Sequence, residues 1–229
     1  MDVKRFSLLE GARRAMGTAV IIDVFRAFTT AAFVMANGAK TIIPVGTVRE
    51  ALELRRCNPE WLIMGEVHGH KVPAFDYGNS PEEVSRIDFT GKTVVQRTSS
   101  GVQGILAALG SEEVLLGSFV TAEAIVEYIK KMNPTVVSLV AMGWEGKYKA
   151  LEDELCAEYL ESRLNRKNPD FNEIVRRIKS DPQGAKFFNP EQTSFKEGDF
   201  HAAMSLNKFH FVLRVRRNVN LCIEKIATF

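Results

Sequence analysis

The chain has 229 residues, of which 45% are hydrophobic and 25% charged, shares typical of a folded globular protein rather than a disordered or collagen-like one. Thirty lysines and arginines against 28 aspartates and glutamates leave a net charge of +2, too small to indicate a nucleic-acid-binding protein. The three cysteines lie far apart and form no Cys-x-x-Cys pair, so we expect neither a disulfide framework nor a zinc site.

The sequence also carries no sign of a membrane or export segment. Its apolar runs are all shorter than the roughly 18 residues that a membrane span needs. Residues 1–14 mix acids and bases and lack the continuous apolar stretch of a signal peptide. We therefore expect a cytoplasmic protein that binds neither membranes nor nucleic acid.

Short β-branched runs alternate with helical patterns over the first two thirds of the chain. Strands are predicted at residues 18–24, 41–45, 61–65, 93–97, 114–116 and 135–140, and helices at 27–37, 47–56, 101–109, 122–131 and 150–164. Thr47 and Glu50 form a capping box, and Ser80, Pro81 and Glu83 together mark another helix start. This alternation predicts an α/β fold with a largely parallel sheet.

The pattern changes after residue 165. Asp170 and Glu173 indicate one more short helix, whereas residues 180–198 are polar and irregular. Residues 209–215 and 221–226, separated by 217–220, predict a closing β-hairpin. We expect a single α/β domain over 1–229, with its motifs in 18–164 and a less defined C-terminal part in 165–229. The hairpin could close the edge of the sheet or pair with a second subunit, which leaves a homodimer as an alternative.

Acidic side chains follow several of the predicted strands, at the sheet edge where open α/β proteins bind ligands. They are Asp23, Glu66, Asp76, Glu152 and Asp153. Carboxylates gathered at one site raise one another's pKa and destabilise a fold unless a cation compensates them, and carboxylate oxygens suit Mg²⁺. The alternatives are a helix cap for Asp23 and favourable helix-dipole contacts for Glu152 and Asp153.

A second group of strand-end residues suits an anion. Hydroxyl groups and a glycine stand at a strand-to-helix junction, where backbone N–H groups are unpaired; these residues are Thr98, Ser99, Ser100 and Gly101. A simple serine helix cap is the alternative. Arg26 could pair with Asp23 or bind phosphate oxygens, and Asn79 and Ser118 could orient substrate or water. The sequence contains no Walker loop, G-x-G-x-x-G or G-x-S-x-G pattern.

Several longer motifs follow one another along the chain. They are VIIDVFRAFTT at 20–30, ANGAK followed by PV at 36–45, GE followed by FDYGNSP at 65–81, GKTVV at 91–95, GSF at 117–119 and ALEDELCA at 150–157. Their order and spacing resemble the 2-phosphosulfolactate phosphatase family. The resemblance implies a three-layer α/β/α fold, Mg²⁺ dependence and hydrolysis of 2-phospho-3-sulfolactate to 3-sulfolactate and phosphate, a step in coenzyme M synthesis. The chain departs from the family pattern at 97–102, where Arg97 could add a positive charge to an anion pocket.

These observations together predict a Mg²⁺-dependent phosphomonoesterase acting on a small, multiply anionic phosphorylated acid. We expect catalysis by Asp23, Arg26, Glu66 and Asp76, with phosphate bound by Arg26 and by residues 98–101. A metal-activated water is favoured over an aspartate as the nucleophile. A phosphotransferase or isomerase of phosphorylated acids is the first alternative, and a catalytically silent anion-binding protein the second.

Overall fold

The structure, a computed structural model, describes residues 1–217 and 221–228. The strands in these ranges are β1 (Asp2–Ser7), β2 (Thr18–Ile22), β3 (Thr41–Pro44), β4 (Leu62–Val67), β5 (His70–Lys71), β6 (Thr93–Arg97), β7 (Glu113–Gly117), β8 (Val136–Ala141), β9 (Phe211–Arg217) and β10 (Leu221–Ala227). The α-helices are α1 (Leu8–Arg13), α2 (Ala27–Ala36), α3 (Val48–Cys57), α4 (Pro81–Val84), α5 (Gly101–Ala107), α6 (Ala122–Met132), α7 (Leu151–Leu164), α8 (Phe171–Ser180), α9 (Pro182–Ala185) and α10 (Glu197–Ala203). Two 3₁₀ turns, η1 (Phe119–Thr121) and η2 (Lys186–Phe188), complete the elements.

The strands form one sheet in the order β1-β8-β2-β7-β9-β10-β3-β6-β4-β5. It contains two parallel groups, β1-β8-β2-β7 and β3-β6-β4. The antiparallel pair β9–β10 lies between them, and the strand pairing of β10 with β3 is limited to Ile223 and Ile42. The predicted hairpin is confirmed as a pair of strands. Of the two alternatives left open for it, closing the edge of the sheet is wrong, because the pair lies in the middle. Residues 218–220 of its predicted connection lie outside the described residues.

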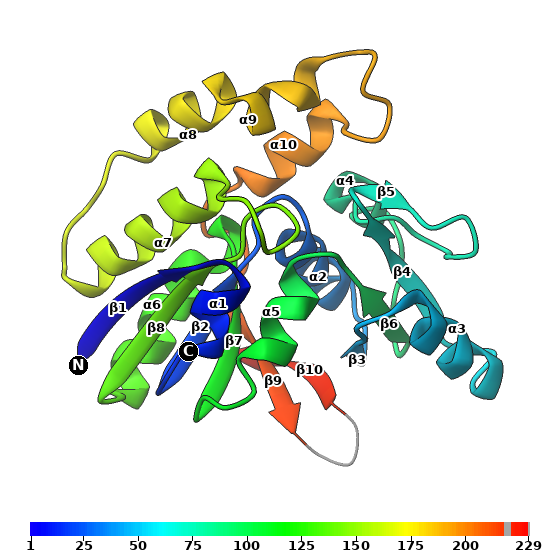
Figure 1. The fold of residues 1–229 in the computed structure, drawn as a ribbon, viewed down its shortest axis with the longest axis horizontal. Coiled ribbons are helices and arrows are strands. Elements are labelled where there is room, and N and C mark those ends of the chain that lie inside the picture. The colour runs from blue at the N-terminus through cyan, green and yellow to red at the C-terminus, as the bar shows by residue number, and fades with distance from the viewer. Residues whose placement is uncertain (218–220, 229) are drawn as a thin grey trace.

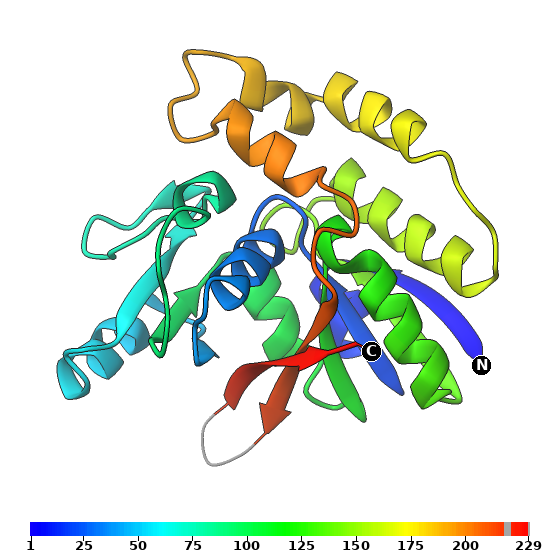
Figure 2. The ribbon, with the colours of Figure 1, turned by 180° about the vertical axis from the view of Figure 1, so that it is seen from behind.

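Helices cover both faces of the sheet (Figures 1 and 2). Successive side chains of a strand point to opposite faces, and in β2 Ile21 joins a core with α2 and α5, while Val20 and Ile22 join a second core with α6 and α7. All five residues of β2 are buried, as a strand covered on both sides requires. The predicted α/β/α fold with a largely parallel, mixed sheet is confirmed.

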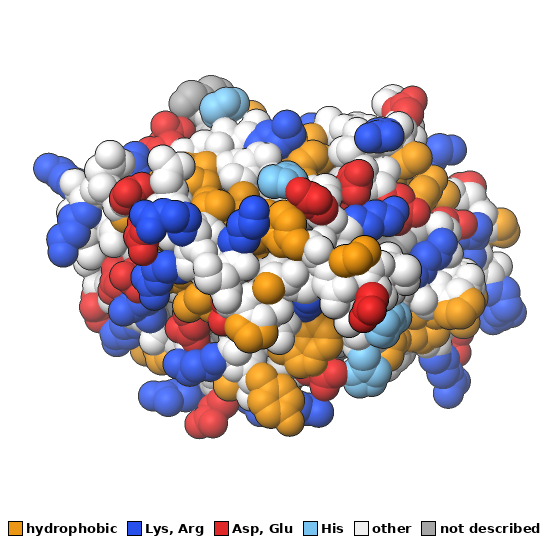
Figure 3. Space-filling view, turned by 90° about the horizontal axis from the view of Figure 1, so that it is seen from above, with side chains coloured by type: hydrophobic (Ala, Val, Ile, Leu, Met, Phe, Trp, Pro, Cys, Tyr) orange, Lys and Arg blue, Asp and Glu red, His pale blue; other side chains and the backbone are white. Residues whose placement is uncertain are grey.

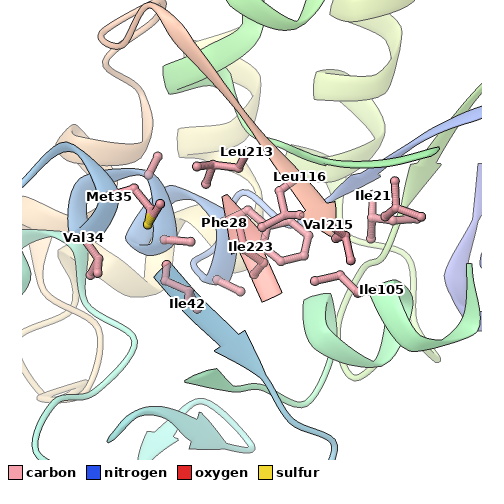
Figure 4. Close-up of a cluster of buried hydrophobic side chains, with 14 of the residues drawn as sticks. Ile21, Phe28, Val34, Met35, Ile42, Ile105, Leu116, Leu213, Val215 and Ile223 are labelled. Atoms are coloured by element: carbon pink, nitrogen blue, oxygen red, sulfur yellow. The ribbon is translucent and has the colours of Figure 1, made fainter. Parts of the chain in front are cut away.

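The first core fills the space between the two parallel groups of strands. Figure 4 shows Phe28 of α2 and Ile105 of α5 beside Leu213 and Val215 of β9, with Ile223 of β10 close by. Burying side chains of this size contributes about 1.5–3 kcal/mol each. The hairpin therefore connects the two halves of the sheet mainly through apolar packing.

Several elements escaped the sequence patterns, among them α1 and β5, and two further cases show why. The first is β1, which pairs in parallel with β8 although its sequence, DVKRFS, mixes charges and apolar residues. Such a strand lies at an edge and is only partly buried, so it lacks the apolar run of a central strand. The second is the polar stretch 180–198, which contains α9, η2 and the start of α10. By contrast, the Thr47–Glu50 capping box is present as predicted.

The helices α8, α9 and α10, with the segments that join them, form a layer at the top of Figure 1, which we call the cap (residues 165–205). Phe187 and Phe200 attach the cap to the α/β layers by packing on Phe25, with ring centroids 4.6 and 5.8 Å from that ring. Seen from above, the surface carries basic and acidic side chains interspersed (Figure 3). Within the described ranges, every helix is too short or too polar to cross a lipid bilayer.

Candidate active site

A small pocket lies where the ends of β2, β4 and β6 meet the cap. Its walls include six residues predicted for the site from the sequence: Asp23, Arg26, Glu66, Asn79, Ser99 and Ser100. Gly69, Trp144, Glu145 and Phe195 are among the others. The cavity has a volume of about 30 Å³, which is room for about two water molecules. It therefore suits a small head group rather than a whole organic substrate.

Asp23 lies directly after β2 and is buried. Its Oδ1 accepts a hydrogen bond from the Ala27 N–H at 3.0 Å, and its Oδ2 accepts one from the Gly101 N–H at 2.8 Å. A Cβ at Gly101 would come within 2.8 Å of Oδ2 and 2.9 Å of the Phe28 ring, so only glycine allows this approach. Burial, assisted by the charge of Glu66, raises the pKa of Asp23 to about 6.

Glu152 and Asp153 occupy the first turn of α7, near Asp23. Asp153 accepts hydrogen bonds from the N–H groups of Val24 and Gly143, both at 2.8 Å, while Oε2 of Glu152 is buried with no hydrogen-bond partner among the described residues. Burial raises the pKa of Glu152 to about 7, and the charge of Asp23 adds to this effect. Burial and the charge of Glu152 likewise hold the pKa of Asp153 well above its usual range.

Glu66 reaches the pocket from β4 and is held by three donors. Its Oε2 accepts from the Gly69 N–H at 2.6 Å and from the Ser99 hydroxyl at 3.2 Å, and its Oε1 accepts from the Ser99 N–H at 2.5 Å. Two N–H groups of the predicted anion loop, those of Ser99 and Gly101, therefore already bond to carboxylates of the protein. This loop holds Glu66 and Asp23 in place.

The remaining side chains of that loop also have protein partners. The Ser100 hydroxyl donates to the Gly143 carbonyl at 2.6 Å and accepts from the Gly146 N–H at 3.2 Å. Thr98 Oγ1 accepts from the Val102 N–H at 3.0 Å, as in a helix cap. Ser100 faces the pocket, whereas Thr98 is not part of its walls. The loop thus connects the ends of β6 and β8.

Arg26 is fixed in the pocket by the cap. Its Nη1 donates to the Ser194 carbonyl at 2.8 Å and to Asp199 at 2.7 Å, and its Nη2 donates to the Gly69 carbonyl at 3.0 Å. The guanidinium lies 4.8 Å from the ring centroid of Phe195. Its Nε–H and one Nη2–H have no partner among the described residues, and these two groups are available to an anion.

Asp199, on α10, is fully buried and forms an ion pair with Arg26. Its Oδ1 also accepts from the Ser80 hydroxyl at 2.5 Å and from the Glu82 N–H at 3.1 Å. Sequence reasoning missed Asp199, because it follows a polar, irregular stretch and carries no motif. It connects the cap to both α4 and Arg26.

Asp76 does not join the other predicted acids. It forms an ion pair with Arg55, with Oδ2 2.5 Å from Nη1, and accepts from the Ile63 N–H at 2.8 Å. Burial opposes its ionisation, but the hydrogen bonds from Arg55 and Ile63 outweigh burial and lower the pKa of Asp76. The expected grouping of five acids therefore contains four in this structure, without Asp76.

Arg97 and Ser118 also lie outside the walls of the pocket. Arg97 Nη1 donates to the Glu66 carbonyl at 2.5 Å and to Ser99 Oγ at 3.0 Å. Arg97 therefore helps to position two residues of the pocket walls without lining the pocket itself. The Ser118 hydroxyl is buried after β7 with no hydrogen-bond partner among the described residues.

Lys186 is a second residue that the sequence reasoning missed. Its ammonium group lies over the rings of Trp144 and Phe195, 4.7 and 4.3 Å from their centroids, and donates to Gln183 at 2.7 Å. Burial lowers the pKa of Lys186 to about 8, although the charge of Glu152 acts in the opposite direction. The cap therefore brings a cation close to the acidic group.

The acids of this site fit Mg²⁺ only if the ion takes further ligands from outside the protein. Within residues 1–217 and 221–228, no three His, Cys, Asp or Glu side chains are grouped so that they could hold a metal ion by themselves. Mg²⁺ commonly binds through one or two carboxylates together with water and substrate phosphate. The buried Oε2 of Glu152, which has no hydrogen-bond partner among the described residues, is the observation that fits a further cation here.

Comparison with known proteins gives one consistent result. A family model described as 2-phosphosulpholactate phosphatase matches residues 6–217. A Bacillus subtilis protein named "Probable 2-phosphosulfolactate phosphatase" is 31% identical over 202 residues, which cover 87% of each chain. Proteins of the same name from Caldicellulosiruptor saccharolyticus and Thermotoga petrophila are 34% and 41% identical, over 91% and 65% of this chain and 91% and 63% of their own lengths.

Proposed function

The chain belongs to the 2-phosphosulpholactate phosphatase family, and we propose that it hydrolyses 2-phospho-3-sulfolactate to 3-sulfolactate and inorganic phosphate with the help of Mg²⁺. The proposal makes the chain a phosphoric monoester hydrolase acting on a small phosphorylated acid.

The observation that carries this proposal is the meeting of opposite charges at one small pocket. Asp23 and Glu66 supply carboxylates, and Arg26 supplies a guanidinium whose Nε–H and one Nη2–H are unpaired. A phosphate monoester needs positive groups around its oxygens, and a divalent ion needs carboxylates beside them.

Mg²⁺ would be held by Asp23 and Glu66, the two carboxylates in the pocket walls, and would neutralise charge on the phosphoryl group and activate water. Glu152 and Asp153 do not line the pocket, but their negative charge lies near Asp23 and so favours a cation at this position.

Arg26 binds the non-bridging phosphate oxygens through its Nε–H and Nη2–H, and Asn79 and Ser99 orient the ester. Water attacks phosphorus directly in this proposal. We favour water over an aspartate because Asp23, whose carboxylate is fixed by two backbone hydrogen bonds, would serve to hold the ion. Direct attack by water inverts the configuration at phosphorus, whereas an aspartyl-phosphate intermediate would retain it.

The test is phosphate release from 2-phospho-3-sulfolactate by the wild-type protein and by Asp23→Asn, each with Mg²⁺ and with EDTA. Loss of this one charged group beside the reacting phosphoryl oxygens should lower kcat/KM at least about 100-fold. EDTA should abolish turnover in the wild type, and added Mg²⁺ should restore it.

Asp76→Asn is the matched control, since Asp76 belongs to the same predicted group of five acids but lies outside the pocket walls. We expect its kcat/KM to stay within about 3-fold of wild type. Equal losses in the two variants would exclude Asp23 from a special role. Phosphate release that needs an acceptor would point to a phosphotransferase, and Mg²⁺ binding without any release would contradict the proposal.

A further inference from the structure

A chamber with a volume of about 210 Å³ adjoins the pocket. Its walls include Arg26, Lys71, Asn79, Ser80, Glu83 and Lys196. Arg26, Gly69 and Asn79 belong to both cavities, so the two share a wall. The pocket alone is too small for a substrate that carries more than a phosphate group. The rest of such a substrate has room in the chamber.

The shared wall contains a polar side chain that lacks partners. Asn79 is only 6% exposed, yet its side-chain amide makes no hydrogen bond with any described residue, and its Oδ1 is completely buried. A buried amide without partners is destabilising, because its hydrogen bonds to water have been lost and not replaced. Because the amide can turn about its terminal bond, it can offer either its oxygen or its nitrogen to a molecule that spans the two cavities.

The charges around the chamber favour an anion. Arg26 is neutralised by Asp199, but Lys71 and Lys196 form no ion pair with any described residue. The Lys71 ammonium donates to the Asp76 carbonyl at 2.8 Å, which places it without neutralising it. Glu83 is the one acid among the wall residues, and its carboxylate accepts from the Gly78 N–H at 3.4 Å.

We propose that this chamber binds the second acidic group of the substrate, a carboxylate or a sulfonate, through Lys71 and Lys196, with Asn79 bridging it to the phosphate pocket. This inference rests on the proposed function, because it assigns the part of the substrate that does not react. The chamber is built from the β5 region and from residues 193–196 of the cap, so the cap selects for acids. Discrimination between phosphorylated acids and neutral phosphate esters follows from these two lysines.

Three related esters measure this selection. They are 2-phospho-3-sulfolactate, 2-phosphoglycerate and glycerol 2-phosphate, which carry a carboxylate and a sulfonate, a carboxylate only, and neither. Lys196→Ala should lower kcat/KM for 2-phospho-3-sulfolactate about 10-fold more than for glycerol 2-phosphate, mainly through KM, since one charge-assisted contact is lost. A matching relative loss for 2-phosphoglycerate assigns the carboxylate to the chamber, and its absence assigns the sulfonate.

Lys167→Ala serves as the control, because Lys167 is exposed and lies between α7 and α8, outside both cavities. A uniform change across the three esters in Lys196→Ala and Lys71→Ala, or no change, would overturn the inference.

A binding experiment separates this inference from the proposed hydrolysis. Calorimetric titration with 3-sulfolactate, which has no phosphate to release, should give a Kd about 10-fold weaker in Lys196→Ala than in wild type and Lys167→Ala. This loss supports the chamber even if no ester is hydrolysed. Equal affinities in all three proteins overturn the chamber even if hydrolysis proceeds.

Discussion

Two groups of buried charges border the pocket, and they differ in how their charge is balanced. Arg26 and Asp199 form a complete set, in which the carboxylate meets a guanidinium, a hydroxyl and an N–H group. Asp23, Glu152 and Asp153 form an incomplete set, in which burial and neighbouring acids raise the pKa of all three carboxyl groups and the Oε2 of Glu152 has no partner among the described residues.

This difference assigns a structural role to the first set and a chemical role to the second. A buried ion pair whose members satisfy each other fixes geometry and is costly to break. Buried acids of the same sign, facing a pocket, are kept at a cost in stability and are typical of sites where a cation and a reacting group bind. We therefore expect changes in the first set to act on folding, and changes in the second to act on pH and metal dependence.

The largest effect on stability is expected from Asp199→Ala. This change leaves the buried Arg26 guanidinium without its counter-charge and should lower the free energy of unfolding by about 3–5 kcal/mol. Urea denaturation of the wild type and the variant measures the difference. Asp199→Asn retains an acceptor and should lose less, and a loss below about 1 kcal/mol in Asp199→Ala would mean that the pair is not structural.

A pH-dependent effect of about 3 kcal/mol is expected from Glu152, whose pKa rises from 4.5 to about 7 on folding. Between these values the folded protein binds more protons than the unfolded chain, so metal-free protein should lose stability as the pH rises from about 4.5 to 7. Urea denaturation in EDTA at several pH values checks this slope.

Glu152→Gln removes this titration and should reduce the slope, most clearly between about pH 6 and 7, because the raised pKa of Asp23 contributes to the slope only up to about pH 6. Added Mg²⁺ should do so in the wild type, because a cation neutralises the group. Parallel slopes for wild type and Glu152→Gln in EDTA would show that Glu152 ionises normally in the folded protein.

The smallest effect is expected from the half-buried pair of Arg55 and Asp76, which serves as a reference for the buried pair. Arg55→Ala should lower the free energy of unfolding by about 1 kcal/mol or less, because a partly exposed ion pair contributes little. The same denaturation measurement applies. A loss as large as that of Asp199→Ala would show that burial is not what distinguishes the two pairs.

The sequence predicted the parts of the site that depend on strand ends. Asp23, Glu66 and Ser99 follow or end apolar runs, and the geometry of an α/β sheet brings such positions together. Asp76 looked equivalent in sequence, but the partner that removes it from the group, Arg55, lies on α3, and no local pattern joins the two.

The contribution of the cap could not be predicted in the same way. Lys186, Ser194 and Asp199 lie in or next to a polar stretch without periodicity, and their roles depend on tertiary contacts with Trp144 and Arg26. The position of the hairpin within the sheet could not be predicted either. A pattern of alternating apolar and polar residues predicts that two strands pair with each other, but not which other strands lie beside them.

The order of the strands has a consequence for synthesis. β9 and β10 follow the other eight strands of this sheet in the chain and so leave the ribosome after them, yet they occupy the middle of the sheet. Until residues 211–227 have emerged, the nascent chain holds two separate blocks of parallel strands, each with an unpaired edge, β7 in one and β3 in the other. Unpaired edges are prone to pair with other chains. Co-translational folding of this sheet is therefore completed at its centre, and the sheet is most prone to aggregation before residues 211–227 emerge.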